Sequence, residues 1–219
     1  MTNQISKEDK AMKIGIIGAG NVGTAFARQL GKAGHEIMLS YSRDEKAMTK
    51  AAKQFGAKTG SAKEAAAFGE VVVLAVPFAA IEDAIAVSGS LDGKILWDCT
   101  NALKPDLSGL EVGTTTSSGE KVATLATGAR VVKAIPPFAE LMHSDNPTIG
   151  GKPPGVFVCG DDAAAKEVVV KLAAELPSTV VEAGPLENAR YIEPASFLCV
   201  RLAYGLGMGS RIGLTLLTE

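Results

Sequence analysis

The sequence is poor in the residues that build metal centres and disulfide frameworks. Its 219 residues include two histidines, His35 and His143, and three widely separated cysteines, Cys99, Cys159 and Cys199. The cysteines have neither disulfide-framework nor metal-ligand spacing, and two histidines do not favour a histidine-based metal site. Because each cysteine lies in an apolar run, we expect buried free thiols. We predict no metal.

A charge imbalance and long apolar runs are also lacking. The net charge of −2 gives no electrostatic reason to expect nucleic acid or an anionic membrane as a partner, and no apolar run is long enough to span a bilayer. Residues 1–11 are polar and lack the apolar core of a signal peptide. We interpret them as a flexible leader and take the cytoplasm as the default location.

Aromatic residues make up only 5% of the chain, whereas 47% of it is apolar, and alanine and glycine are abundant. This composition suits tightly packed layers of helices on a sheet. Short buried strands alternate with helical segments, which indicates βαβ units and a parallel sheet. The strands are expected near 14–17, 36–39, 71–76, 94–99 and 130–135. The fold class is therefore α/β, with a Rossmann-type doubly wound sheet.

The first strand is followed by a glycine-rich turn and a helix. Gly18, Gly20 and Gly23 have G-x-G-x-x-G spacing within the segment 12–43. In this context Gly18 makes the tight turn, Gly20 lets a pyrophosphate approach the backbone, and Gly23 lets helix and strand pack closely. The helix N-terminus offers free N–H groups to the phosphates. The segment predicts dinucleotide binding.

The end of the second strand indicates which dinucleotide binds. Sites for NAD usually place an acidic residue there, but this chain has no carboxylate before Asp44. Ser42, Arg43 and Lys46 instead supply a hydroxyl and positive charge where a 2′-phosphate would lie. We interpret this as a preference for NADP. In the alternative, Arg43 and Lys46 form a solvated helix start that pairs with Asp44 and Glu45.

Ligands of such sheets bind beyond the carboxyl ends of the strands. That rule brings five loops together, which are Gly18–Val22, Tyr41–Arg43, Val76–Phe78, Thr100–Ala102 and the Pro136-Pro137 turn. Asn101 either bonds the nicotinamide ribose or carboxamide, or caps a turn. His143 is a weak candidate proton donor, with a solvated loop histidine as the alternative. Asp98 is read as a turn residue, and Glu193 as a surface or interface carboxylate.

A change in composition suggests where a second domain begins. Residues 143–154 are dense in Gly, Pro, Asn and Asp. We therefore divide the chain into an NADP-binding Rossmann domain, 12–150, and a small C-terminal α/β substrate or dimerisation domain, 151–219. The latter is expected to end in a long apolar helix from about Asn188 to Leu217.

That last segment is apolar almost all round, which is typical of a buried helix. We expect it to pack across the first domain and across a second subunit. The glycines within it, Gly205, Gly207 and Gly209, are costly in a helix interior. They mark a break in the helix, or a close approach of its backbone to a ligand or partner.

Several motifs together resemble a known family. They are KIGIIGAGNVG, GHEIMLSYSRDEKA, VVVLAVPF, VVKA and the C-terminal run VFVCGDDAAAK…VEAGPLENARYIEP. The chain resembles NADPH-dependent reductases of the deazaflavin coenzyme factor 420, over roughly 12–217. More distantly it is similar to the cytosolic reductase domains of membrane metalloreductases and to pyrroline-carboxylate reductases.

The resemblance implies a cofactor site and a homodimer. The glycine loop and the basic residues that would bind NADP are Gly18, Ala19, Gly20, Asn21, Val22, Ser42, Arg43 and Lys46. The strand ends predicted to complete the cofactor site are Ala75, Val76, Pro77, Asn101, Ala134 and Ile135. The homodimer is expected to form through the C-terminal helix, with the deazaflavin in the cleft under the C-terminal domain.

Two departures from the family pattern affect these implications. Ser42 stands where the family often has a second arginine, and Ile135-Pro136-Pro137 replaces a Phe-Asn-Thr found in many relatives. The second change alters the nicotinamide pocket, so the sequence does not specify the acceptor.

Two classes of function follow from the sequence. One is an oxidoreductase that transfers a hydride between NADPH and deazaflavin or another small acceptor, such as a flavin, a ferric chelate or a cyclic imine. The cofactors then carry the chemistry, and the protein holds the two rings together. The other is a non-catalytic NADPH-binding module that controls a partner. An open cleft would favour the enzyme.

Overall fold

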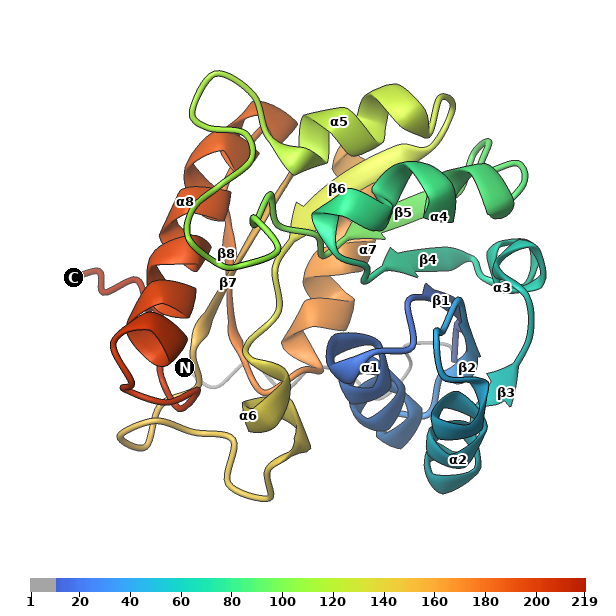
Figure 1. Ribbon diagram of the computed structural model, residues 1–219, viewed down its shortest axis with the longest axis horizontal. Coiled ribbons are helices and arrows are strands. Elements are labelled where there is room, and N and C mark those ends of the chain that lie inside the picture. Colours follow the sequence, from blue (N-terminus) through green and yellow to red (C-terminus); the bar gives the residue numbers. More distant parts are fainter. Residues whose placement is uncertain (1–10) are drawn as a thin grey trace.

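The computed structural model describes residues 11–219, so the predicted leader lies, apart from Ala11, outside the described residues. One sheet of eight strands runs through the molecule in the order β3-β2-β1-β4-β5-β6-β7-β8 (Figure 1). Its strands are β1 (Lys13–Ile17), β2 (Glu36–Ser40), β3 (Lys58–Thr59), β4 (Val71–Leu74), β5 (Ile95–Asp98), β6 (Arg130–Ala134), β7 (Gly155–Gly160) and β8 (Thr179–Glu182). The predicted α/β Rossmann-type fold is confirmed.

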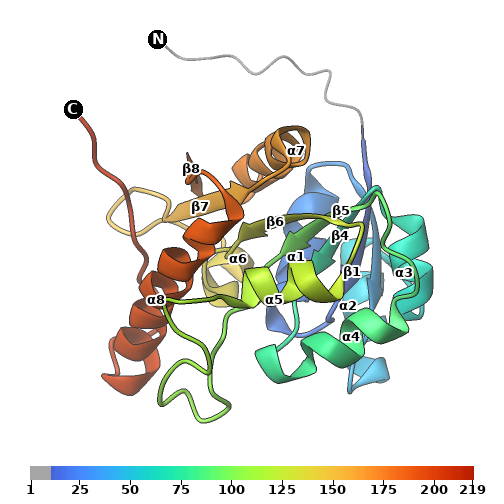
Figure 2. The same ribbon diagram turned by 90° about the horizontal axis from the view of Figure 1, so that it is seen from above.

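Helices cover both faces of the sheet (Figure 2). One face packs against α1 (Asn21–Lys32), α2 (Glu45–Phe55), α6 (Ala139–His143) and α7 (Ala163–Ala174). The other packs against α3 (Ala62–Phe68), α4 (Ile81–Val87), α5 (Ser118–Leu125) and the start of α8 (Ala189–Val200). Two short 3₁₀ turns precede helices, η1 (Phe78–Ala80) before α4 and η2 (Leu186–Asn188) before α8.

The two cores follow from the alternation of side chains along each strand. In β4, Val71 and Val73 belong to one core, while Val72 and Leu74 belong to the other. All four side chains are buried. A strand that is covered on both faces needs such an unbroken apolar run, which is why VVVL could be identified from the sequence.

The only antiparallel pair within the described sheet is β6 with β7, where Ala134 lies opposite Val158. The strands β7 and β8, which we assigned to a separate C-terminal domain, therefore extend the same sheet. The reversal comes after the Pro136-Pro137 turn, where proline cannot continue a central strand, and after a connection through α6. The division into two domains stays a prediction.

The long C-terminal helix expected from 188 to 217 is wrong in its length. Helix α8 ends at Val200, a single π-helical turn (η3, Arg201–Gly205) follows, and residues 206–219 contain no helix. Gly207 and Gly209 adopt φ angles of 70° and 79°, which a right-handed helix cannot contain. Nor is the segment buried on all sides, since Leu206 is 70% exposed. No helix in the described part of the chain is long and apolar enough to cross a membrane.

Candidate active site

The glycine turn after β1 combines two packing constraints with one open position. A Cβ on Gly23 would lie 1.8 Å from the carbonyl oxygen of Gly18, and one on Gly18 would lie 2.3 Å from that of Ala75. These glycines let the turn contact α1 and β4. A Cβ on Gly20 would meet no protein atom within 4 Å, so packing does not explain that glycine. The turn leaves open space in front of the N-terminus of α1, as a bound pyrophosphate requires.

The end of β2 lies beside this turn. The amide of Gly18 donates to the carbonyl of Ser40, and that of Ala19 donates to the carbonyl of Tyr41. Tyr41 is held in the left-handed region, with a φ of 55°, and its hydroxyl donates to Asp83 at 2.5 Å. This hydrogen bond, assisted by burial, raises the pKa of Tyr41. The polypeptide after β2 is thereby fixed next to the glycine turn.

Two basic side chains follow Tyr41 at the start of α2. Asp44 accepts a hydrogen bond from the amide of Ala47 and caps the helix, while the Ser42 hydroxyl bonds the backbone of Asp44. Among the described ion pairs none engages the exposed Arg43 or Lys46. The alternative, in which these bases pair with Asp44 and Glu45, therefore has no ion pair to support it.

A cavity of about 540 Å³ runs from the glycine turn along the carboxyl edge of the sheet. Of the predicted cofactor residues it brings together Gly20, Asn21, Val22, Ala75, Val76, Pro77, Asn101 and Ile135. Its further walls come from Phe78, Cys99, the 103–107 loop, Pro136, Pro137, Phe138, Ala139, Glu140 and, across the cavity, Ser196, Val200 and Tyr204. The expectation that ligands bind beyond the carboxyl ends of the strands therefore identified the edge of the sheet where the cavity lies.

The other predicted residues lie outside this lining. Gly18 and Ala19 form the turn beneath Gly20, and Ser42, Arg43 and Lys46 follow β2. Ala134 is fully buried, and its carbonyl accepts a hydrogen bond from Trp97. The ring of His143 stacks on Phe55 and lies 3.5 Å from the hydroxyl of Thr24. The structure thus gives His143 no place on the cavity wall.

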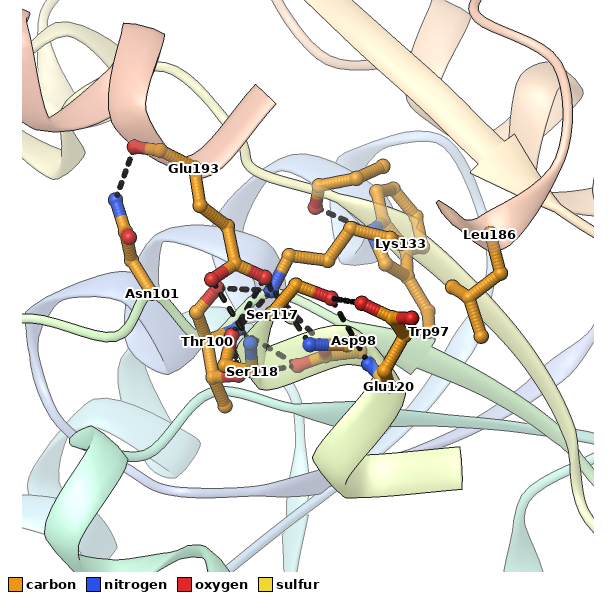
Figure 3. A network of polar contacts seen from close by, with 12 residues as sticks. Trp97, Asp98, Thr100, Asn101, Ser117, Ser118, Glu120, Lys133, Leu186 and Glu193 are labelled. Atoms are coloured by element: carbon orange, nitrogen blue, oxygen red, sulfur yellow. Dashed lines mark hydrogen bonds and ion pairs between the residues drawn. The ribbon is translucent and has the colours of Figure 1, made fainter. Parts of the chain in front are cut away.

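Behind Asn101 lies a buried polar network that the sequence did not suggest (Figure 3). Lys133 of β6 is fully buried, and its ammonium group lies 2.9 Å from Asp98 and 3.0 Å from Glu193. It also donates to the hydroxyl of Ser118 and the carbonyl of Thr100. The expectation that Glu193 is a surface or interface carboxylate is wrong, because it is 2% exposed and its carboxylate is bound by Ser118, Gly119 and Lys133 of the same chain.

The charges of this network stabilise one another. Burial acts to lower the pKa of Lys133, but the attraction of Asp98 and Glu193 outweighs it, and the pKa is raised. The amides of Ser118 and Gly119, at the start of α5, donate to Glu193. They bring the positive end of a helix dipole to the second carboxylate. A lysine inside the apolar strand RVVKA was the available signal, since buried lysines need partners.

Asn101 connects the network with the cavity. Its Nδ2 donates to the backbone carbonyl of Glu193 at 3.3 Å. Its Oδ1 is buried and is the one described buried side-chain atom without a hydrogen-bond partner. Because leaving a buried acceptor unpaired is costly, and Asn101 lines the cavity, this oxygen is suited to accept from a bound ligand. The turn role of Asp98 is also present, since its Oδ1 accepts from the amide of Thr100.

Fold and site together define a Rossmann-type dinucleotide-binding protein with a largely apolar cavity at the carboxyl edge of its sheet. Residues 13–102 match the model of the family described as NADP oxidoreductase, coenzyme F420-dependent. A crystal structure from Arthrobacter sp. FB24, provisionally assigned as an F420-dependent NADP reductase, is 30% identical. It superimposes with a TM-score of 0.83 over 95% of this chain and 100% of that one. The chain belongs to this family of F420-dependent NADP oxidoreductases.

Curated relatives extend the comparison. An F420-dependent NADP reductase of Methanocaldococcus jannaschii is 29% identical over 87% of this chain and 92% of its own length. The metalloreductase STEAP3 of Rattus norvegicus is 28% identical over 87% of this chain, but the match spans only 37% of that protein. A reductive aminase from Aspergillus terreus, at 22% identity and a TM-score of 0.65, shows the shared fold; the match covers 90% of this chain and 63% of that one.

Proposed function

We propose that this protein transfers a hydride from NADPH to a flat small-molecule acceptor, and that the deazaflavin coenzyme F420 is that acceptor. The observation that carries the proposal is the continuity of the cavity, which begins at the open Gly20 turn and reaches the apolar wall of α8. The names of the F420-dependent relatives support the choice of acceptor.

The residues present fit NADP at three points. Gly20 and the N-terminus of α1 would receive the pyrophosphate, with Arg43 and Lys46 near the 2′-phosphate. The orphaned Oδ1 of Asn101 would accept from the carboxamide or ribose of the nicotinamide half. When bound, NADPH supplies the hydride, and the protein contributes orientation.

The acceptor side of the cavity is poor in acids and bases. Apart from the thiol of Cys99, whose pKa burial raises well above its usual value, the titratable lining residues are Lys104, Glu140 and Tyr204. Pro77, Phe78 and the 135–138 segment supply apolar surface that excludes water. Such walls suit direct hydride transfer between two stacked rings, which needs proximity more than proton transfer.

The cavity is also open to solvent, because Lys104 is exposed and Tyr204 is half exposed. An open compartment next to the nicotinamide position supports an enzyme over the non-catalytic NADPH-binding module. We further propose a homodimer formed through the outer face of α8, where Tyr191 and Leu198 are 64% and 53% exposed. The three free thiols agree with a location in the cytoplasm.

The decisive experiment follows NADPH oxidation by absorbance with four acceptors, which are F420, FMN, a ferric chelate and a cyclic imine. We expect a kcat/KM for F420 at least 100-fold above the others, and no comparable rate with NADH. Preference for the ferric chelate or the imine would reassign the acceptor. Tight NADPH binding without turnover of any acceptor would refute the enzyme and support the module.

A further inference from the structure

The side chain of Glu193 links helix α8 to the start of α5 and to β6. Its carboxylate accepts from the amides of Ser118 and Gly119, at 2.9 and 3.0 Å, and from the hydroxyl of Ser118 at 2.8 Å. The ammonium group of Lys133 lies 3.0 Å from the same carboxylate. With this many partners, the position of Glu193 relative to the ends of β5 and β6 is strongly determined (Figure 3).

The main chain of Glu193 also contacts Asn101. Its carbonyl accepts the hydrogen bond from Nδ2 of Asn101. The two ends of a carboxamide are rigidly connected, so a partner that holds the nitrogen also sets the direction of the oxygen. The side chain of Glu193 thus helps to fix its own carbonyl, and that carbonyl orients the buried, unpartnered Oδ1 of Asn101, a residue that lines the cavity.

We propose that Glu193 is a positioning residue for the ligand, acting through Asn101, and that the oriented Oδ1 accepts from an N–H or O–H of the nicotinamide half of the cofactor. This inference rests on the proposed function, because it takes NADPH as the cavity's ligand. The Asp98–Lys133–Glu193 network thereby takes part in ligand binding. A link that only holds two helices together would have no such role.

Another ion pair nearby links α5 and α8 without contacting the cavity. Arg190 of α8 makes a paired contact with Glu120 of α5, through bonds of 3.0 and 2.7 Å. Neither residue lines the cavity or contacts Asn101. Burying charges as the Glu193 network does carries a large desolvation cost, which the Arg190–Glu120 link, being partly exposed, largely avoids. The two links therefore form a matched pair for experiment.

The test is a double-mutant cycle on NADPH affinity, measured by calorimetry without an acceptor, with urea unfolding of each variant in parallel. Asn101→Ala is expected to weaken NADPH binding about tenfold, and Glu193→Gln about threefold to tenfold, as the loss or misdirection of one hydrogen bond predicts. In the Asn101→Ala background, Glu193→Gln should have no further effect on affinity. Glu120→Gln should leave affinity unchanged in both backgrounds.

Each contrary result has a distinct meaning. An equal loss of affinity from Glu193→Gln with and without Asn101 would overturn the positioning role and leave a structural one. An unchanged affinity in Asn101→Ala would also overturn it, while NADPH binding by the wild-type protein would keep the cofactor assignment. If the wild-type protein binds no NADPH, the proposed function fails first. Should Glu193→Gln not fold, Ser118→Ala removes one donor to Glu193 and repeats the cycle.

Discussion

The ammonium group of Lys133 lies 2.9 Å from the carboxylate of Asp98, and neither side chain is exposed to solvent. Replacing Lys133 by methionine would leave two buried carboxylates without their cation. We expect the free energy of unfolding to fall by about 3–5 kcal/mol, the usual cost of breaking a buried pair. Lys121→Met, which breaks the more exposed contact with Glu82, should change the free energy of unfolding far less. Urea unfolding of both variants measures the difference; similar losses would contradict it.

The same lysine makes stability depend on alkaline pH. Burial opposes its charge, but the carboxylates of Asp98 and Glu193 more than compensate, so the pKa of Lys133 is raised on folding. Its stabilisation is complete below the ordinary lysine pKa and is lost as the pH rises through the raised value. The deficit of Lys133→Met should therefore shrink in strongly alkaline buffer. Unfolding curves over a series of alkaline pH values test this, and a constant deficit would argue against it.

Gly20 and Gly23 should respond to the same substitution in opposite ways. A Cβ at Gly23 would overlap the carbonyl oxygen of Gly18, whereas one at Gly20 would meet no protein atom. Gly23→Ala is expected to lower the free energy of unfolding by about 1–3 kcal/mol through overpacking. Gly20→Ala should change the free energy of unfolding by less than about 1 kcal/mol but weaken NADPH binding at least tenfold. Equal affinity in Gly20→Ala and wild type would show that the pyrophosphate lies elsewhere.

Discrimination between NADPH and NADH should depend on Arg43. The structure shows no ion pair for this exposed guanidinium within the described residues, so it remains available to a 2′-phosphate. Charged hydrogen bonds contribute about 1.5–3 kcal/mol, and Arg43→Ala should accordingly weaken NADPH binding about 10- to 100-fold while NADH binding stays constant. Lys50→Ala, in the next turn of α2, is the control. A parallel loss for both cofactors would remove the basis for the NADP preference.

The proposed dimer makes Leu198 a sensitive position. This side chain is 53% exposed on α8, and a charge there would be buried against the second copy. We expect light scattering to give twice the 22.5 kDa of one chain for the wild-type protein and a monomer for Leu198→Glu. Val87→Glu, at a similarly exposed residue of α4, should remain dimeric. A monomeric wild-type protein would rule out the proposal.

The parts of the structure that depend on local sequence could be predicted. The glycine turn is specified by Gly18 and Gly23, whose neighbours lie close in sequence or follow from strand pairing, and the parallel core follows from apolar runs such as Val71–Leu74. The cavity residues were found because strand ends share one edge. The buried network could not be found in this way, since one of the two carboxylates that stabilise the charged Lys133, that of Glu193, comes from a distant helix.

The length of the C-terminal helix could not be predicted from the apolar composition of its sequence. The segment 188–217 is apolar almost all round, and we therefore predicted one long buried helix in which the three glycines mark a break or a close approach to a ligand or partner. In the structure the helical segment ends at Gly205, and Gly207 and Gly209 beyond it adopt left-handed φ angles. The sequence did contain the warning in its glycine spacing, but it did not show whether the glycines break the helix or bring it close to a ligand.

The residues that line the cavity fall into two groups along the chain. The lining residues up to Asn101 come from the glycine turn and from the ends of β4 and β5, whereas the later ones come from the 103–107 loop, the 135–140 segment, α8 and η3. Mutations in the later segments, Ile135 apart, can thus reshape the cavity for a different acceptor while the residues predicted to bind the nucleotide stay unchanged. Related proteins could therefore evolve to reduce a different acceptor while they keep the same nucleotide as the hydride donor.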